Sequence, residues 1–94
     1  MLDEVISTCR SINHERSTVG VALKVAEETG ELAQAISKNQ GYEEVVSEVA
    51  DVIIAATDAG FQAALDIGGQ GTYEADLMIA ISNKLAKWCQ VYGK

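Results

Sequence analysis

Two pairs of acidic residues, each with a spacing of three, stand out in the middle of this chain. Glu28 and Glu31 form the first pair, and Glu48 and Asp51 form the second. On a helix, residues three apart lie on nearly the same face, roughly 4.5 Å apart along the axis. Carboxylate oxygens are the ligands that Mg²⁺ and Mn²⁺ prefer in proteins, so each pair could supply half of a metal site.

The polar segment 37–41 separates the two pairs and predicts how they meet. A turn in this segment would fold the flanking helices into an antiparallel hairpin. Glu31 and Glu48 lie at nearly equal distances in sequence from Gln40, and so do Glu28 and Asp51. The four carboxylates should therefore face one another at one level of the hairpin. Because like charges at this spacing repel, the arrangement favours a bound divalent cation.

The rest of the chain predicts the helices that would position these acids. Apolar residues recur with helical spacing over residues 2–11, 19–38, 42–60 with an extension toward 65, and 72–92. Asn39, Gln40 and Gly41 should end the second helix, and residues 66–71 form a connector. The absence of proline and the few aromatic residues argue against an all-β fold. We expect one all-α domain over residues 1–94.

Three of these helices carry an apolar stripe beside or opposite their charged residues. The stripes consist of Ala22, Val25, Thr29, Leu32 and Ile36; of Val45, Val46, Val49, Ile53 and Ala56; and of Leu77, Ile81, Leu85, Trp88 and Tyr92. Apolar residues make up 48% of the chain, which is generous for a domain of this size. We therefore expect a homo-oligomer, a dimer or a tetramer, in which a partner covers part of these faces.

Composition and charge exclude several classes of function. The net charge of −7, without any basic run, argues against binding to the nucleic-acid backbone or to an anionic membrane. The longest apolar run, residues 52–57, is too short to span a bilayer, and the acidic N-terminus does not resemble a signal peptide. Cys9 and Cys89 form no CxxC pair, so we expect a cytoplasmic protein with two reduced, semi-buried thiols.

The text around the acids carries a family resemblance. KVAEETGELAQAI followed by EEVVSEVADVIIAA resembles the MazG-type all-α nucleoside triphosphate pyrophosphohydrolases, which carry ExxE, a variable spacer and ExxD. The resemblance extends loosely over the whole chain. It implies a four-helix, MazG-like bundle completed by oligomerisation, with sites at subunit contacts. It also implies Mg²⁺-dependent hydrolysis of a nucleoside triphosphate to the monophosphate and pyrophosphate.

The resemblance assigns roles to individual residues. Mg²⁺, with Mn²⁺ as a substitute, would be held by Glu28, Glu31, Glu48 and Asp51. Glu28 or Glu31 would also orient or deprotonate the attacking water. The residues expected to contact the substrate are Lys24, Lys84, His14 and Lys87. Surface ion pairs remain the alternative for the lysines, and an interhelical loop position remains the alternative for His14. Trp88 stands where many members of the family have an asparagine, which weakens the assignment of phosphate contacts to the last helix.

Two other functions compete with this one. The related phosphoribosyl-ATP pyrophosphohydrolases share the acidic pattern, but they usually follow the aspartate with Leu-(Leu/Met)-Tyr-His, whereas this chain has Val-Ile-Ile-Ala at 52–55. That enzyme therefore ranks second. A non-catalytic helical dimerisation module belongs to another class, and the presence of all four acids argues against it. The sequence does not determine the base or sugar of the nucleotide.

Overall fold

The structure, a computed structural model, describes residues 1–12 and 16–93. Its elements are α1 (Leu2–Ser11), α2 (Thr18–Ser37), α3 (Tyr42–Asp66), the short 3₁₀ helix η1 (Gln70–Thr72) and α4 (Tyr73–Tyr92). The described residues contain no strand, so the all-α prediction is confirmed. The bounds follow the sequence pattern closely, and α3 takes the longer of its two predicted lengths.

Local chemistry explains where the central helices begin and end. The Ser17 hydroxyl accepts a hydrogen bond of 3.2 Å from the backbone N–H of Gly20, which makes Ser17 the N-cap of α2. In the turn that follows α2, Asn39 and Gly41 both have positive φ angles, 51° and 100°. Asn and Gly adopt this left-handed region more readily than other residues. The turn therefore reverses the chain where the sequence predicted.

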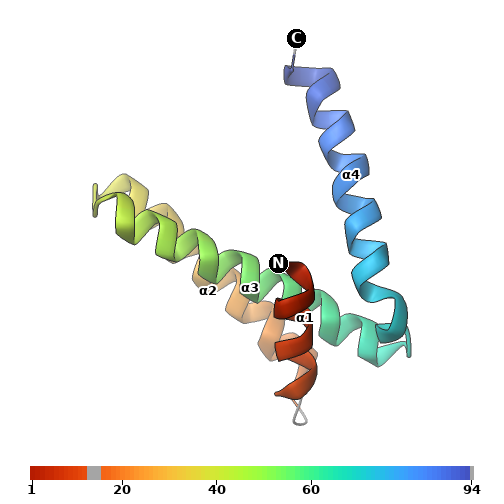
Figure 1. Ribbon diagram of the computed structural model, residues 1–94. Coiled ribbons are helices and arrows are strands. Elements are labelled where there is room, and N and C mark those ends of the chain that lie inside the picture. Colours follow the sequence, from red (N-terminus) through yellow and green to blue (C-terminus); the bar gives the residue numbers. More distant parts are fainter. Residues whose placement is uncertain (13–15, 94) are drawn as a thin grey trace.

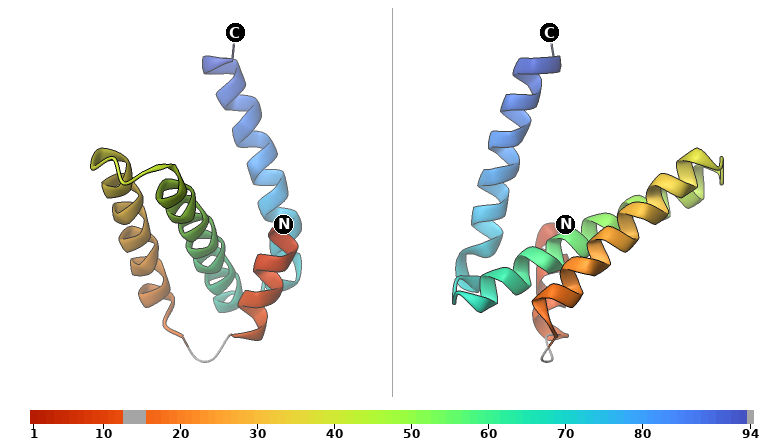
Figure 2. Two further views of the ribbon diagram at one scale, coloured as in Figure 1. Left: turned by 60° about the vertical axis from the view of Figure 1, so that its left-hand side comes forward. Right: turned by 180° about the vertical axis from the view of Figure 1, so that it is seen from behind.

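The helices do not form a closed four-helix bundle within one chain. α2 and α3 run side by side as an antiparallel hairpin, α1 crosses α3, and α4 leaves from the far end of α3 (Figure 1). From η1 onward α4 diverges from the hairpin, as Figure 1 and the right-hand view of Figure 2 show. Within the described residues α4 contacts α1, α3 and η1 but not α2. Completion of a bundle by a second chain stays a prediction.

The apolar core lies where α1, α3 and α4 meet. Ile6, Cys9 and Phe61 are its buried members, and Leu2, Val5, Leu65 and Tyr73 pack around them. The Tyr73 hydroxyl donates a 2.7 Å hydrogen bond to the carbonyl oxygen of Thr57, which joins the start of α4 to α3. Gly60 lies directly against the Tyr73 ring, so a Cβ atom at this position would overlap the phenol.

The hairpin buries different residues from those that the apolar stripes predicted. On α2 the buried residues are Val21, Glu28 and Ala35, whereas Thr29 and Ile36 of the predicted stripe are exposed. On α3 the small Ala55 is buried beside α2, and the larger residues Val46, Val49 and Ile53 of the predicted stripe are 47%, 39% and 38% exposed. Small side chains let the two backbones approach closely. Val25, Leu32 and Val45 of the predicted stripes are half-buried. The helices therefore pair through small and acidic residues together with part of each stripe, and the rest of each stripe faces outward.

The two cysteines differ in their surroundings. Cys9 is buried, and Cys89 is exposed near the end of α4 because that part of α4 packs against nothing else in the described chain. The prediction of a semi-buried thiol is therefore wrong for Cys89. Both are free thiols. None of the helices in the described chain is both long and apolar enough to cross a membrane.

Candidate metal centre

Three of the four predicted carboxylates come together across the hairpin. Each of Glu28, Glu48 and Asp51 offers an oxygen, and these oxygens lie within 4.8 Å of one another. Glu28 comes from α2, and the other two come from α3. Glu28 is only 7% exposed, which is unusual for a carboxylate. The antiparallel pairing thus joins residues from both halves of the sequence motif, as their spacing from the turn predicted.

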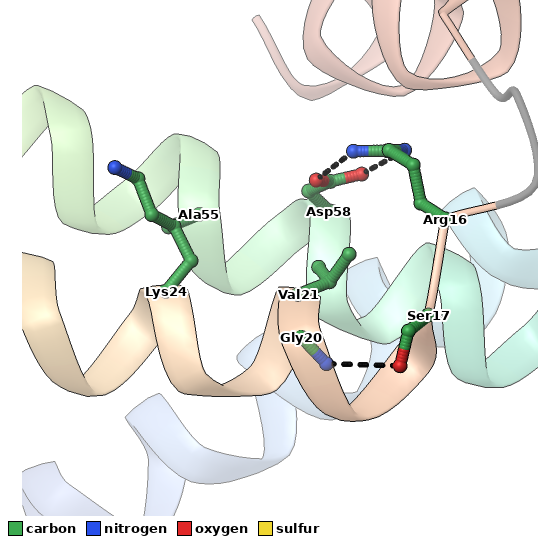
Figure 3. A pocket seen from close by; sticks show the side chains of 7 residues that line it. All are labelled: Arg16, Ser17, Gly20, Val21, Lys24, Ala55 and Asp58. Atoms are coloured by element: carbon green, nitrogen blue, oxygen red, sulfur yellow. Dashed lines mark hydrogen bonds and ion pairs between the residues drawn. The ribbon is translucent and has the colours of Figure 1, made fainter.

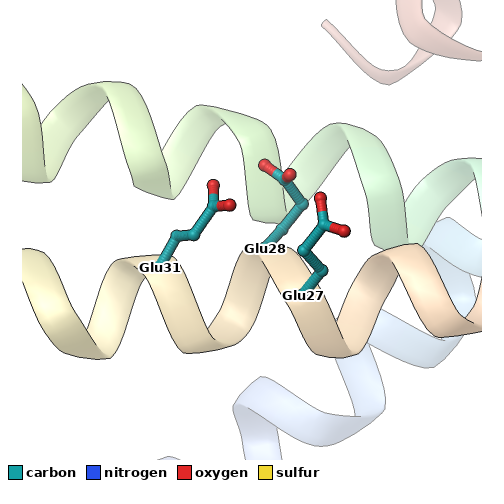
Figure 4. Close-up of side chains that lie close together, drawn as sticks. All are labelled: Glu27, Glu28 and Glu31. Atoms are coloured by element: carbon teal, nitrogen blue, oxygen red, sulfur yellow. The ribbon is translucent and has the colours of Figure 1, made fainter.

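Glu31 lies beside this centre and belongs to a second group. Carboxylate oxygens of Glu27, Glu28 and Glu31 also lie within 4.8 Å of one another along α2 (Figure 4). Glu28 is common to both groups. The prediction that four carboxylates meet at one point holds for three of them, with Glu31 adjacent. Glu27 was not predicted as a site residue, although its spacing of four from Glu31 was a signal that could have indicated it.

The electrostatics of the centre favour a cation. Burial raises the pKa of Glu48 to about 7, and a hydrogen bond with the Asp51 carboxyl contributes next. The negative charges of Glu31, Glu44 and Asp51 raise this pKa further. A carboxyl group in this environment holds its proton near neutral pH unless a positive charge replaces it. A divalent cation among these oxygens would supply that charge.

Lys24 neutralises part of the negative charge beside the centre. Its ammonium lies 2.8 Å from a carboxylate oxygen of Glu27 and 3.5 Å from one of Glu28. These neighbours raise the pKa of Lys24, the Glu27 hydrogen bond being the largest cause. The Lys24 side chain is 58% exposed. In this structure Lys24 forms the surface ion pair that was the alternative to substrate binding, and it stands next to the centre.

A cavity of about 350 Å³ adjoins the centre near the start of α2 (Figure 3). Arg16 and Lys24 line it, together with Ser17, Gly20 and Asp58. The Arg16 guanidinium donates two hydrogen bonds to the Asp58 carboxylate, at 2.6 and 2.8 Å. The pairing of Asp58 with Arg16 was not predicted from the sequence. Because this pair joins residues far apart in the chain, only the folded structure reveals it.

The remaining predicted substrate contacts are not brought to the acids. Lys84 and Lys87 are exposed on α4, and that helix makes no contact with α2 among the described residues. His14 and its neighbour Asn13 lie outside the described residues. Nothing in the described chain lies within 4 Å of the position that a Cβ atom at Gly30 would take, so no neighbour in the described chain requires glycine there.

No protein-family model, no curated protein and no solved structure matches this chain. The resemblance to the MazG-type enzymes therefore rests on the motif residues and their flanking text.

Proposed function

We propose that this protein is a Mg²⁺-dependent nucleoside triphosphate pyrophosphohydrolase that acts as a homo-oligomer. The observation that carries the proposal is the convergence of Glu28, Glu48 and Asp51 from two helices, with Glu28 buried. A buried cluster of carboxylates is costly without a cation. Together with the resemblance of the motif, the oxygen ligands favour Mg²⁺, with Mn²⁺ as a substitute.

Different residues have different roles in the proposed hydrolysis. Glu28, Glu48 and Asp51 would hold the metal ion, which polarises a phosphoryl oxygen when bound. Glu31 stands beside this group, so we assign it to orient the attacking water and accept its proton. Water attacks the α-phosphorus, and the bond from that phosphorus to the bridging oxygen breaks. The products are the nucleoside monophosphate and intact pyrophosphate.

The neighbouring cavity offers space for the rest of the substrate. Arg16 and Lys24 line it and could balance phosphate charge. Of the two, Lys24 lies beside the centre, 3.5 Å from a Glu28 oxygen. Arg16 is partly occupied by Asp58, so the free hydrogen-bonding capacity of its guanidinium is limited. The acidic net charge of the chain makes a metal-bound substrate more suitable than a bare polyanion.

The test is release of pyrophosphate from ribo-, deoxy- and modified nucleoside triphosphates in the presence of Mg²⁺. Asp51→Asn should abolish turnover and keep the helical circular dichroism spectrum, because it removes a ligand but little volume. Reaction in ¹⁸O-labelled water should place the label in the monophosphate only. Release of orthophosphate, or undiminished turnover in excess chelator, would rule out the mechanism.

The exposed apolar faces of α3 and α4 favour a second candidate, a non-catalytic helical dimerisation module. This candidate predicts no turnover of any nucleoside triphosphate and no effect of Asp51→Asn on the protein's behaviour. Screening for pyrophosphate release separates the two candidates directly.

A further inference from the structure

The short connector between α3 and α4 has the features of a pivot. Gly68 adopts a positive φ of 73°, and Gly69 and Gly71 follow it before α4 begins. At the start of α4, the Tyr73 hydroxyl donates a 2.7 Å hydrogen bond to the Thr57 carbonyl oxygen of α3. No residue of α4 is buried in the described chain, and Figure 1 shows α4 diverging from α3 beyond this anchor. α4 is therefore held near its first turn and not along its length.

An apolar cleft of about 390 Å³ lies in the angle between the two helices. Its walls include Ile53 and Thr57 of α3 and Leu77 and Ile81 of α4, which shows the sides of the helices that face each other. Beyond the cleft, further residues continue these two sides because they follow at spacings of three or four. They are Leu85, Trp88 and Tyr92 on α4 and Val49, Val46 and Tyr42 on α3, and all six are exposed. The inner sides of the opening thus carry two uncovered stripes.

The two stripes match each other in register. In an antiparallel helix pair, positions at equal distances in sequence from the middle of the connector lie at one level. Counted from Ile67, the matching positions are Thr57 with Leu77, Ile53 with Ile81, Val49 with Leu85, Val46 with Trp88, and Tyr42 with Tyr92. The first two pairs already share the cleft. The last pair joins the first residue of α3 to the last residue of α4, so the two helices also match in length.

We infer that α4 closes onto α3 by turning about this pivot, and that the structure is the open form of a two-state device. Closure buries the exposed members of both stripes against one another, which is favourable because they are largely apolar. The short connector holds the stripes at an effective concentration of roughly millimolar. At micromolar protein concentration, closure within one chain is therefore favoured over contact with a second copy.

Closure determines which surface the chain offers to other molecules. Glu48 and Asp51 approach Glu28 of α2, on the opposite side of α3 from its stripe, so closure leaves the metal centre uncovered. It covers the face of α3 that any partner on that side would need. The closed form is thus an internal block on assembly through this face, and α4 must open before a partner binds there.

Trp88 is the only tryptophan of the chain and reports closure directly. Its side chain is 61% exposed in the open form and packs against Val46 in the closed form. Its emission should be blue-shifted and shielded from acrylamide, equally at submicromolar and micromolar protein concentration. Val46→Asp should lower the equilibrium constant for closure by about tenfold or more, because closure would bury a charge, and should expose Trp88. Ser47→Asp, exposed and off the stripe, is the matched control and should leave Trp88 shielded. Circular dichroism checks that both variants keep their helices.

Cysteine cross-linking tests the register of the closed form. In a Cys89→Ser background, which keeps the buried Cys9, Val49→Cys with Leu85→Cys should form a disulfide within one chain under mild oxidation. Val46→Cys with Ile81→Cys places both thiols on the stripes but about two turns out of register, and should not. Trp88 open to acrylamide at every concentration, shielding that appears only as concentration rises, disulfides between chains, or equal cross-linking of both pairs would overturn the inference. None of these readouts measures turnover, so they are independent of the proposed reaction.

Discussion

Binding of Mg²⁺ or Mn²⁺ at the carboxylate centre should release a proton from Glu48. Its pKa of about 7 in the folded protein means that the carboxyl group is about 90% protonated at pH 6 and about 10% at pH 8. A bound cation requires the carboxylate form. Metal binding should therefore release about 0.9 proton per chain at pH 6 and about 0.1 at pH 8.

The raised pKa of Glu48 also determines how the stability of the metal-free protein depends on pH. The pKa of Glu48 rises from an ordinary value of 4.5 to about 7 on folding. Between these values the folded chain holds more protons than the unfolded chain, so stability decreases as pH rises. The contribution is fully present below pH 4.5 and is lost above pH 7. Saturating metal should remove this decrease, because the cation stabilises the charged form.

Isothermal titration calorimetry measures the released protons directly. Metal is titrated at each pH in two buffers that differ in ionisation enthalpy, and the difference in heat gives the number of protons. Glu48→Gln should bind metal more weakly and release no proton from this position. Glu44→Gln is the matched control, because Glu44 is only a minor cause of the raised pKa and should leave most of the release intact. The single histidine, His14, is present in every variant. Equal release at pH 6 and pH 8, or full release in Glu48→Gln, would refute the reasoning.

Three further predictions concern the frame around the centre. Gly60→Ala should lower the free energy of unfolding by about 1–2 kcal/mol. The new methyl group displaces Tyr73 from its hydrogen bond, and the free energy lost is larger than the gain from the higher helix propensity of alanine. Gly30→Ala places its methyl group in open space and should instead raise the free energy of unfolding by about 1 kcal/mol. Urea unfolding measures both variants, and a Gly60→Ala protein more stable than wild type would contradict the contact between Gly60 and Tyr73. Asp58→Asn should cost about 1–3 kcal/mol, because the partly buried Arg16 loses its carboxylate partner; unchanged urea unfolding would show that the pair adds nothing. Thiol-reactive dye should modify the exposed Cys89 quickly and Cys9 slowly, because burial raises the pKa of Cys9 to about 11, and equal rates would contradict the burial.

Much of the fold follows from the sequence alone. The helix bounds were predictable because apolar spacing, the Ser17 cap and the Asn39–Gly41 turn are local signals that need no tertiary contact. The meeting of Glu28 with Glu48 and Asp51 was also predictable, because a hairpin fixes which levels of its two helices face each other. Here local spacing and a single turn were sufficient.

Only the tertiary structure decided which faces the helices bury. The stripe rule predicted that the apolar stripes lie inward, but those stripes are at most half-buried. The residues that the hairpin buries are Val21, Glu28, Ala35 and Ala55. The sequence pattern gives the faces of each helix but not its rotation about its own axis, which depends on how closely two backbones can approach. For the same reason the Arg16–Asp58 pair and the departure of α4 could not be foreseen, since both depend on contacts between residues distant in the chain.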